Sequence, residues 1–155
     1  MNKEEIINEL EDVILDINLF IRQQLGSEIS SALEAKIASL SSNQLMTLFL
    51  VAKKELNHVK DIASYLNIST SAVSQIVGKL ENQGFLHREI NQANRRSTII
   101  TLGCKGTELI NEMDQIKSTI FQQYLSKMEV EDLLLLKNSF KKFLTVLVES
   151  KEDHD

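Results

Sequence analysis

The chain has no proline and no tryptophan, one cysteine and five glycines among its 155 residues, and only 5% of its side chains are aromatic. All-β sandwiches and barrels need many tight turns and use aromatic residues heavily, so this composition favours helices. The lone cysteine, Cys104, excludes a disulfide framework within the chain. The segment MNKEEIINEL at the start carries acidic side chains where a secretory signal needs an apolar run, which predicts a cytoplasmic protein.

Charge is unevenly distributed along the chain. The net charge of -5 counts against a nucleic-acid partner, because Lys and Arg are the residues that bind phosphate. Residues 57–106, however, contain six basic and three acidic residues, a net charge of +3, and the rest of the chain carries -8. This asymmetry indicates a middle segment that faces an anion between acidic, solvated flanks. Scattered charge without a function is the alternative.

Length and apolar patterning predict one compact, mainly helical domain over residues 1–155. With 43% hydrophobic and 25% charged residues, a chain of this length can bury enough surface to fold without a metal or a disulfide. Apolar residues recur at the helical spacings of three and four over residues 6–25, 29–40, 42–54, 105–128 and 133–147. Breaks are expected at residues 26–27 and at Ser126, where Glu129 offers a capping box. Ser41 and Gln44 form a second capping box before residue 42.

The segment from His58 to Asn82 has the pattern of a helix-turn-helix. A first short helix is expected around Ala63, whose small side chain permits a close helix crossing, and Asn67 begins a tight break. Ser69 is a good N-cap for a second helix that runs to about Asn82, and Gly84 is expected to close it in a left-handed C-cap. The buried stripe of that second helix is expected to consist of Val73, Ile76, Val77 and Leu80.

Two short runs rich in β-branched residues, FLHREI and STIITL, follow the second helix. The polar turn NQANRR separates them, so they predict a two-stranded hairpin, and a hairpin that directly follows a helix-turn-helix is a wing. The predicted fold is therefore mainly α with a small β-hairpin wing. Residues 41–103 are expected to form its winged helix-turn-helix lobe.

The order and spacing of these segments resemble the MarR family of bacterial winged helix-turn-helix transcription regulators. The resemblance is carried by LSSNQ from residue 40 and by the blocks IASYLNISTSAVSQIVGKLENQGFLHR and NRRSTIITLGCKG. It implies an obligate homodimer, with residues 1–40 and 104–150 as the dimerisation region, that binds double-stranded DNA at a pseudopalindromic operator. It also implies repression that a small-molecule effector or an oxidant relieves.

Two residues depart from the family pattern. Asn94 stands where an acid usually precedes the wing arginines, and an amide holds a guanidinium less firmly than a carboxylate does. Gly103 stands where Thr usually follows the strand leucine. Glycine is an acceptable N-cap, so the fold is expected to survive this change.

The polar face of the second helix is the first candidate for binding DNA. Ser and Gln side chains can bond base edges in the major groove, and Lys can reach phosphate. We predict contacts from Ser69, Thr70, Ser71, Ser74, Gln75 and Lys79. Gly78 in mid-helix costs about 1 kcal/mol relative to alanine, which indicates that a backbone comes close to something there. A merely solvated helix face is the alternative.

The hairpin tip is the second candidate for binding DNA. Arginines at a tip can enter a narrow minor groove, and Arg96 matches the wing arginine of the family. We therefore predict wing contacts from Asn94, Arg95, Arg96 and Ser97. Lys60 and Arg88 are further candidates for phosphate contacts. A solvated pair of turn charges is the alternative.

Cys104 is the candidate for a redox site. It lies beside Lys105 at or near a helix N-terminus, and both features favour a reactive thiol. A lone cysteine is more often a small buried residue, and the chain offers no resolving partner. Buried packing is therefore the expected role.

Patterns for catalysis and metal binding are missing from the sequence. His58, His87 and His154 lie far apart, and no Ser-His-Asp set or glycine-rich phosphate loop is recognisable. We expect no enzyme activity, no cofactor, no metal and no membrane partner. The residues of an effector site are not specified by any motif.

Leucines at 133–136 surround the final helix instead of following one stripe, which predicts burial on more than one side. A partner surface explains this better than a central helix inside one chain. The sequence therefore predicts a homodimeric, DNA-binding transcription regulator, in which an effector changes the separation of two recognition helices. A winged-helix module that binds a protein, and a redox-sensing regulator acting through Cys104, are the alternatives.

Overall fold

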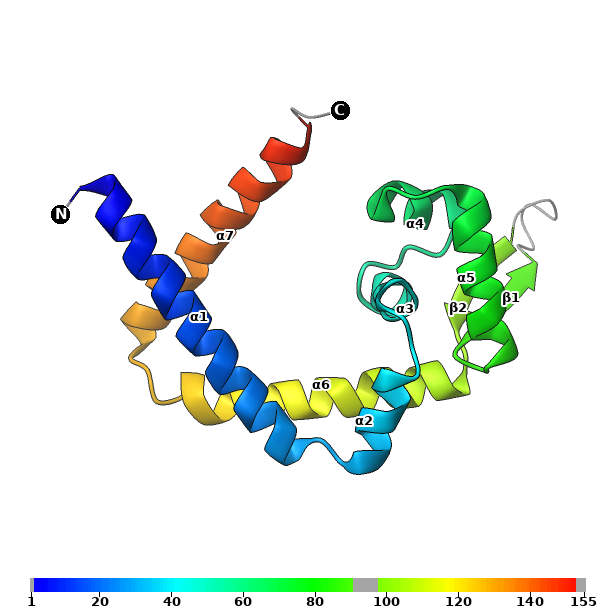
Figure 1. Ribbon diagram of the computed structural model, residues 1–155, viewed down its shortest axis with the longest axis horizontal. Coiled ribbons are helices and arrows are strands. Elements are labelled where there is room, and N and C mark those ends of the chain that lie inside the picture. The colour runs from blue at the N-terminus through cyan, green and yellow to red at the C-terminus, as the bar shows by residue number, and fades with distance from the viewer. Residues whose placement is uncertain (1, 91–97, 153–155) are drawn as a thin grey trace. The chain divides into compact units, whose positions relative to one another are not determined.

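The computed structural model describes residues 2–90 and 98–152 (Figure 1). Over these residues the chain forms seven helices and two strands, in the order α1–α5, β1, β2, α6 and α7. It divides into two compact units at the boundary between Ile116 and Lys117. The predicted class, mainly helical with a two-stranded antiparallel wing, is confirmed.

The first helix, α1 (Lys3–Glu28), begins at a capping box between Asn2 and Glu5. It continues through residues 26–27, so the break predicted there is wrong by two residues. Glycine costs only about 1 kcal/mol in a helix, and the Ser27 hydroxyl donates a hydrogen bond to the Gln24 carbonyl oxygen at 2.7 Å. The chain becomes extended at Ile29, and α2 (Ser31–Ala38) follows.

The helix-turn-helix forms where the sequence predicts it. Helix α3 (Ser42–Lys53) begins at the predicted capping box, and α4 (Val59–Leu66) ends at Asn67, which adopts the left-handed conformation with φ 51°. Ser69 caps α5 (Thr70–Asn82). The predicted left-handed residue at the end of α5 is Gly84, with φ 80°. The N–H of Phe85 donates to the Leu80 carbonyl oxygen at 2.8 Å, which completes the closing turn.

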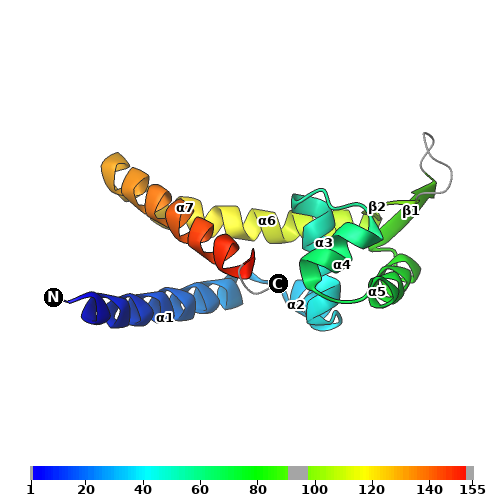
Figure 2. The same cartoon turned by 90° about the horizontal axis from the view of Figure 1, so that it is seen from above.

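The wing consists of β1 (Leu86–Ile90) and β2 (Thr98–Leu102), paired antiparallel with Leu86 opposite Leu102. The backbone N–H of Ile100 donates to the carbonyl oxygen of Asn57 at 2.8 Å, so the free side of β2 is tied to the segment before α4. In both views α3, α4 and α5 lie beside this hairpin (Figures 1 and 2). The hairpin is therefore held by the same core as the helix-turn-helix.

The core of the first unit runs from α2 to α6 (Cys104–Leu125). Its most buried apolar side chains, each less than 2% exposed, are Leu33, Leu48, Ile62, Val73, Val77, Leu80, Leu86, Ile100 and Leu109. Each stabilises the fold by about 1.5–3 kcal/mol relative to an exposed position. Ala63 is 5% exposed, in agreement with a close helix crossing. Ile76, predicted to be buried, is only half-buried.

Helix α6 starts against the turn that closes α5. The carbonyl oxygen of Gly103 accepts the N–H of Thr107 at 2.9 Å, so Gly103 is the N-cap as predicted. A Cβ at Gly103 would lie 2.5 Å from the Gly84 carbonyl oxygen, and a Cβ at Gly106 would overlap the carbonyl oxygen of Phe85. Glycine at 103 is therefore required by the close backbone approach and not merely tolerated as a cap.

The second unit contains the end of α6 and α7 (Val130–Glu152). The predicted break between them exists, but α6 ends at Leu125 and α7 begins at Val130. The Glu129 carbonyl oxygen accepts the N–H of Leu133 at 3.0 Å, so Glu129 and not Ser126 occupies the N-cap position. The N–H of Ser126 still bonds to the Gln122 carbonyl oxygen, and Ser126 thus finishes α6 instead of starting α7. No helix among the described residues is long and apolar enough to cross a membrane.

Candidate nucleic-acid interface

Helix α5 has one buried side and one polar, exposed side. Val73, Val77 and Leu80 are fully buried. The exposed residues are Thr70, Ser71, Ser74, Gln75, Lys79 and Asn82. The exposed side of this helix therefore carries five of the six residues that were predicted to contact the major groove. Ser69 is also exposed, but its hydroxyl oxygen accepts the N–H of Ala72 at 3.1 Å and is used as the N-cap.

The starts of α3 and α5 both favour an anion. Neither helix has an acidic residue in its first turn, so the partial positive charge of the unpaired N–H groups is not offset there. In α5 the Ser69 hydroxyl caps the N–H of Ala72, and Thr70 and Ser71 at the start of the helix have short polar side chains. Phosphate binds well at such helix ends.

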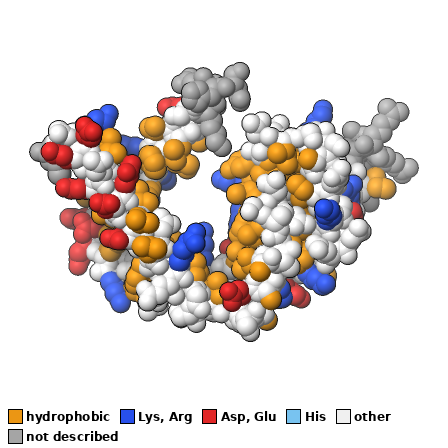
Figure 3. Space-filling view, viewed as in Figure 1, with side chains coloured by type: hydrophobic (Ala, Val, Ile, Leu, Met, Phe, Trp, Pro, Cys, Tyr) orange, Lys and Arg blue, Asp and Glu red, His pale blue; other side chains and the backbone are white. Residues whose placement is uncertain are grey.

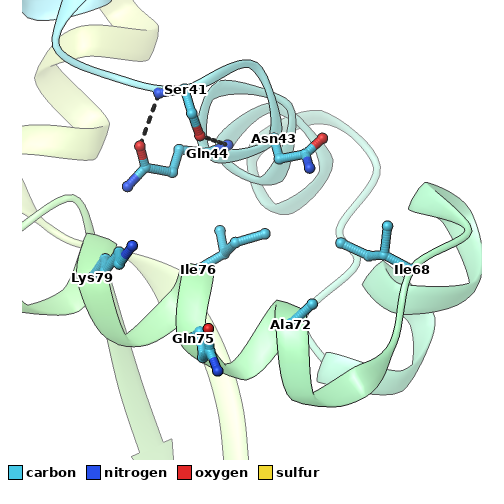
Figure 4. Close-up of a pocket in the computed structure, with 8 residues that line it drawn as sticks. All are labelled: Ser41, Asn43, Gln44, Ile68, Ala72, Gln75, Ile76 and Lys79. Atoms are coloured by element: carbon cyan, nitrogen blue, oxygen red, sulfur yellow. Dashed lines mark hydrogen bonds between the residues drawn. The ribbon is translucent and has the colours of Figure 1, made fainter.

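An open pocket of about 300 Å³ lies between α5 and the start of α3 (Figure 4). Its lining residues are Ser41, Asn43, Gln44, Ile68, Ala72, Gln75, Ile76 and Lys79. Gln75 and Lys79 come from α5, as predicted, and Ile76 is half-buried because it lines this opening. Polar side chains from both helices line the opening together with Ile68, Ala72 and Ile76, and such polar groups suit contacts to both bases and phosphates.

Asn43 and Gln44 of α3 are not among the residues predicted to bind DNA. Gln44 is engaged in the capping box, where its side-chain oxygen accepts the N–H of Ser41 at 2.8 Å (Figure 4). Asn43 is exposed, and its side chain lies outside the capping pair. The signal for it in the sequence is the polar run SSNQ, in which the capping box accounts for Ser41 and Gln44 but not for Asn43.

Arg88 lies on β1, and its side chain reaches across to α5. Its Nη2 donates to the Ser74 carbonyl oxygen at 3.1 Å, and its Nε lies 3.3 Å from Oε2 of Glu81. The guanidinium also passes Gly78, where an added Cβ would lie 3.9 Å from Nη2. That separation is an ordinary contact, so packing within the described part of the chain does not require glycine at 78.

The other predicted residues are placed as follows. Lys60 is exposed in the first turn of α4. Cys104 is exposed as the first residue of α6, so the expectation of a buried cysteine is wrong. The wing residues Asn94, Arg95, Arg96 and Ser97 lie outside the described residues and stay predictions.

No group of three His, Cys, Asp or Glu side chains suited to a metal ion occurs within residues 2–90 and 98–152.

Comparison with known proteins agrees with this geometry. Residues 40–98 match the sequence model of the MarR family. The chain is 29% identical over 104 residues to the organic hydroperoxide resistance transcriptional regulator of Bacillus subtilis (strain 168), an alignment that covers 67% of this chain and 69% of that protein.

Solved structures share the fold. A MarR-like transcriptional regulator from Thermotoga maritima superposes with a TM-score of 0.69 at 24% identity, covering 96% of this chain and 98% of that one. MepR of S. aureus bound to ethidium bromide gives 0.65 at 21% identity, covering 88% and 95%. Residues 40–98 thus resemble the MarR family of DNA-binding transcriptional regulators, and the chain shares the winged helix-turn-helix fold of these solved structures.

Proposed function

We propose that the protein regulates transcription as a homodimer that binds a pseudopalindromic operator, with α5 of each protomer in the major groove. The observation that carries this proposal is the exposed polar side of α5 opposite a fully buried apolar side. The MarR family, whose sequence model residues 40–98 match, consists of transcriptional regulators, which supports the prediction that the chain is not an enzyme.

The contacts are assigned by side-chain chemistry. Ser71 and Gln75 lie four residues apart and Lys79 follows after another four, so they form one line along the exposed side of α5. Ser and Gln are suited to base edges, and Lys79 and Lys60 are suited to phosphate. Arg95 and Arg96 are proposed to bind the adjacent minor groove, supported by their place in the sequence between β1 and β2.

The homodimer is supported by the apolar side chains that α1 leaves in solvent (Figure 3). No residue of α1, all of which the structure describes, is buried. Its large side chains that are at least 41% exposed are Ile6, Ile7, Leu10, Val13, Ile14, Leu15, Ile17, Leu19 and Phe20. Soluble monomers rarely leave so much contiguous apolar surface in water. A second copy that covers it is the economical explanation.

Helix α7 carries a similar surface. Its large apolar side chains that are exposed are Val130, Leu134, Leu135, Phe140, Phe143, Leu144, Val146, Leu147 and Val148. We assign residues 1–40 and 104–150 to the dimerisation region and residues 41–103 to the DNA-binding lobe. Two such lobes would then be carried by one shared set of helices.

We propose that a small effector releases the repressor from DNA in the cytoplasm. Half-sites lie about 34–36 Å apart, so an effector that shifts the two α5 helices by a few ångströms breaks their register. Two relatives support effector control by their names: the B. subtilis protein is a hydroperoxide resistance regulator, and MepR was solved with ethidium bromide.

The proposal is tested by DNA binding at several salt concentrations. Wild-type protein is used to select duplexes from a random-sequence library, and fluorescence anisotropy then compares the selected duplex with a scrambled one. We expect tighter binding of the selected duplex, with an affinity that falls steeply as salt rises. The competing hypothesis, a module that binds a protein, predicts weak binding with no preference between the duplexes.

A further inference from the structure

We propose that Arg88 is a positioning residue: together with Glu81 it fixes the recognition helix α5 against strand β1 of the wing. This proposal rests on the proposed function, because it concerns how the two DNA-binding elements are held in register. It differs from the sequence prediction, in which Arg88 contacts phosphate directly.

The contacts of the Arg88 guanidinium span two turns of α5. Ser74 and Glu81 are seven residues apart, and therefore lie on the same side of the helix about two turns from each other. Nη2 of Arg88 donates to the Ser74 carbonyl oxygen at 3.1 Å, and Nε lies 3.3 Å from Oε2 of Glu81. A single side chain of the wing strand thus contacts two successive turns of the recognition helix.

Burial makes the Glu81 contact necessary. The Nε atom of Arg88 is shielded from solvent and has no aligned hydrogen-bond partner among the described residues. The carboxylate of Glu81 therefore compensates, through its charge, a donor that water does not reach. The two side chains are 35% and 36% exposed, so solvent screens the pair in part and its strength is moderate.

Arginine suits this position better than lysine does. Its planar guanidinium presents several N–H groups in a fixed fork, and two of its nitrogens are used on separate partners here. The single ammonium of a lysine has no such fork and meets one partner at a time. The guanidinium passes Gly78 at an ordinary contact distance, 3.9 Å from an added Cβ, so its position does not depend on the glycine.

Substitution of Glu81 separates a positioning role from a purely electrostatic effect, because the two predict opposite changes in DNA affinity. A carboxylate on a DNA-binding lobe repels phosphate, so its removal strengthens binding if charge alone matters. If Glu81 instead holds Arg88 and α5 in place, its removal weakens binding to the preferred sequence. Simultaneous contacts by α5 and the wing depend on their relative placement, and small errors in placement cost affinity mainly where base edges are read.

The test compares Glu81→Gln and Arg88→Lys with a charge-matched control, Glu89→Gln. Glu89 is the exposed neighbour of Arg88 on β1, and its substitution removes the same negative charge. Dissociation constants are measured by anisotropy for the duplex selected by wild-type protein and for a scrambled duplex, at several salt concentrations. Thermal unfolding followed by circular dichroism reports the folded fraction of each variant.

We expect Glu81→Gln and Arg88→Lys to weaken binding of the selected duplex by about five- to tenfold, with little change for the scrambled duplex and an unchanged salt slope. Glu89→Gln is expected to leave both affinities equal to wild type or slightly tighter. In the double variant Glu81→Gln/Arg88→Lys the two losses are expected to be less than additive, because the residues act as one unit.

Four results would overturn the proposal. Glu81→Gln that behaves like Glu89→Gln shows that only charge matters at 81. Arg88→Lys that keeps its affinity, with Arg88→Gln lowering the salt slope by about 1, shows a direct phosphate contact. Equal losses on both duplexes together with a smaller folded fraction show a structural role only. Wild-type protein that prefers no duplex refutes the proposed function, and this positioning role with it.

Discussion

Replacing Gly103 with alanine tests whether the close approach at the start of α6 is real. The substitution adds one methyl group at the N-cap of α6, a position where alanine is less favourable than glycine. The added Cβ would lie 2.5 Å from the carbonyl oxygen of Gly84, whereas ordinary contacts begin at 3.4 Å. The neighbour is backbone, so no side chain can rotate away to relieve the overlap.

The loss in the free energy of unfolding follows from the backbone contacts that the added methyl group disrupts. The backbones have to separate by about 0.9 Å, and two hydrogen bonds join them: Gly103 N–H to Phe85 O at 2.9 Å and Lys105 N–H to Gly84 O at 3.2 Å. Weakening both costs about 1–3 kcal/mol, and overpacking costs about 1–3 kcal/mol more. We expect the free energy of unfolding to fall by about 2–6 kcal/mol, out of a total of about 5–15 kcal/mol.

Urea unfolding followed by circular dichroism measures this loss, at one fixed protein concentration because the stability of a dimer depends on concentration. Gly78→Ala is the matched control in the same lobe, where the nearest atom to the added methyl group lies at 3.9 Å. We expect that control to raise the free energy of unfolding by about 1 kcal/mol. An unfolding midpoint for Gly103→Ala at or above that of wild type would show that the approach of the two backbones is not as close as described.

Three further predictions concern DNA binding, redox response and assembly. Gln75→Ala is expected to lose about 1–3 kcal/mol of binding free energy per half-site on the selected duplex, since it removes a base-edge contact. Its binding to a scrambled duplex is expected to stay the same. Anisotropy on the two duplexes checks this, and equal losses on both contradict it. Cys104→Ser and wild type are expected to respond alike to peroxide in the same assay, because a lone thiol has no resolving partner, and a response confined to wild type refutes this. Phe143→Asp is expected to convert a micromolar dimer to monomers or unfolded chains in sedimentation experiments, with Lys141→Asp as the control on the same helix; a folded wild-type monomer contradicts it.

The helix-turn-helix was predictable because its signals are local. Ser69 bonds to a backbone group three residues ahead, Asn67 and Gly84 adopt left-handed conformations that their side chains permit, and the buried positions of α5 recur at the helical period. Each of these features is decided within one or two turns of chain. Weaker local signals were misread at Gly26 and Ser126, where the hydrogen bonds of the continuing helix outweighed them.

The exposed polar side of α5 was predictable for the same reason. The period of α5 alone places Ser71, Gln75 and Lys79 on one exposed side. Asn43 joins them only because α3, more than 25 residues earlier in the chain, packs against α5 and opens a pocket there. No spacing within either helix specifies that meeting.

Tertiary structure alone decided the roles of Gly103 and Arg88. In the sequence Gly103 is one acceptable N-cap among several. Only in the folded chain does the Gly84 carbonyl oxygen lie so close that a side chain at position 103 would overlap it. Arg88 is one cation among six in the basic middle segment, and only the packing of β1 on α5 brings it to Ser74 and Glu81. Caps and periodicity depend on bonds to near neighbours in the chain, whereas steric exclusion and charge pairing depend on atoms that folding brings together from distant positions.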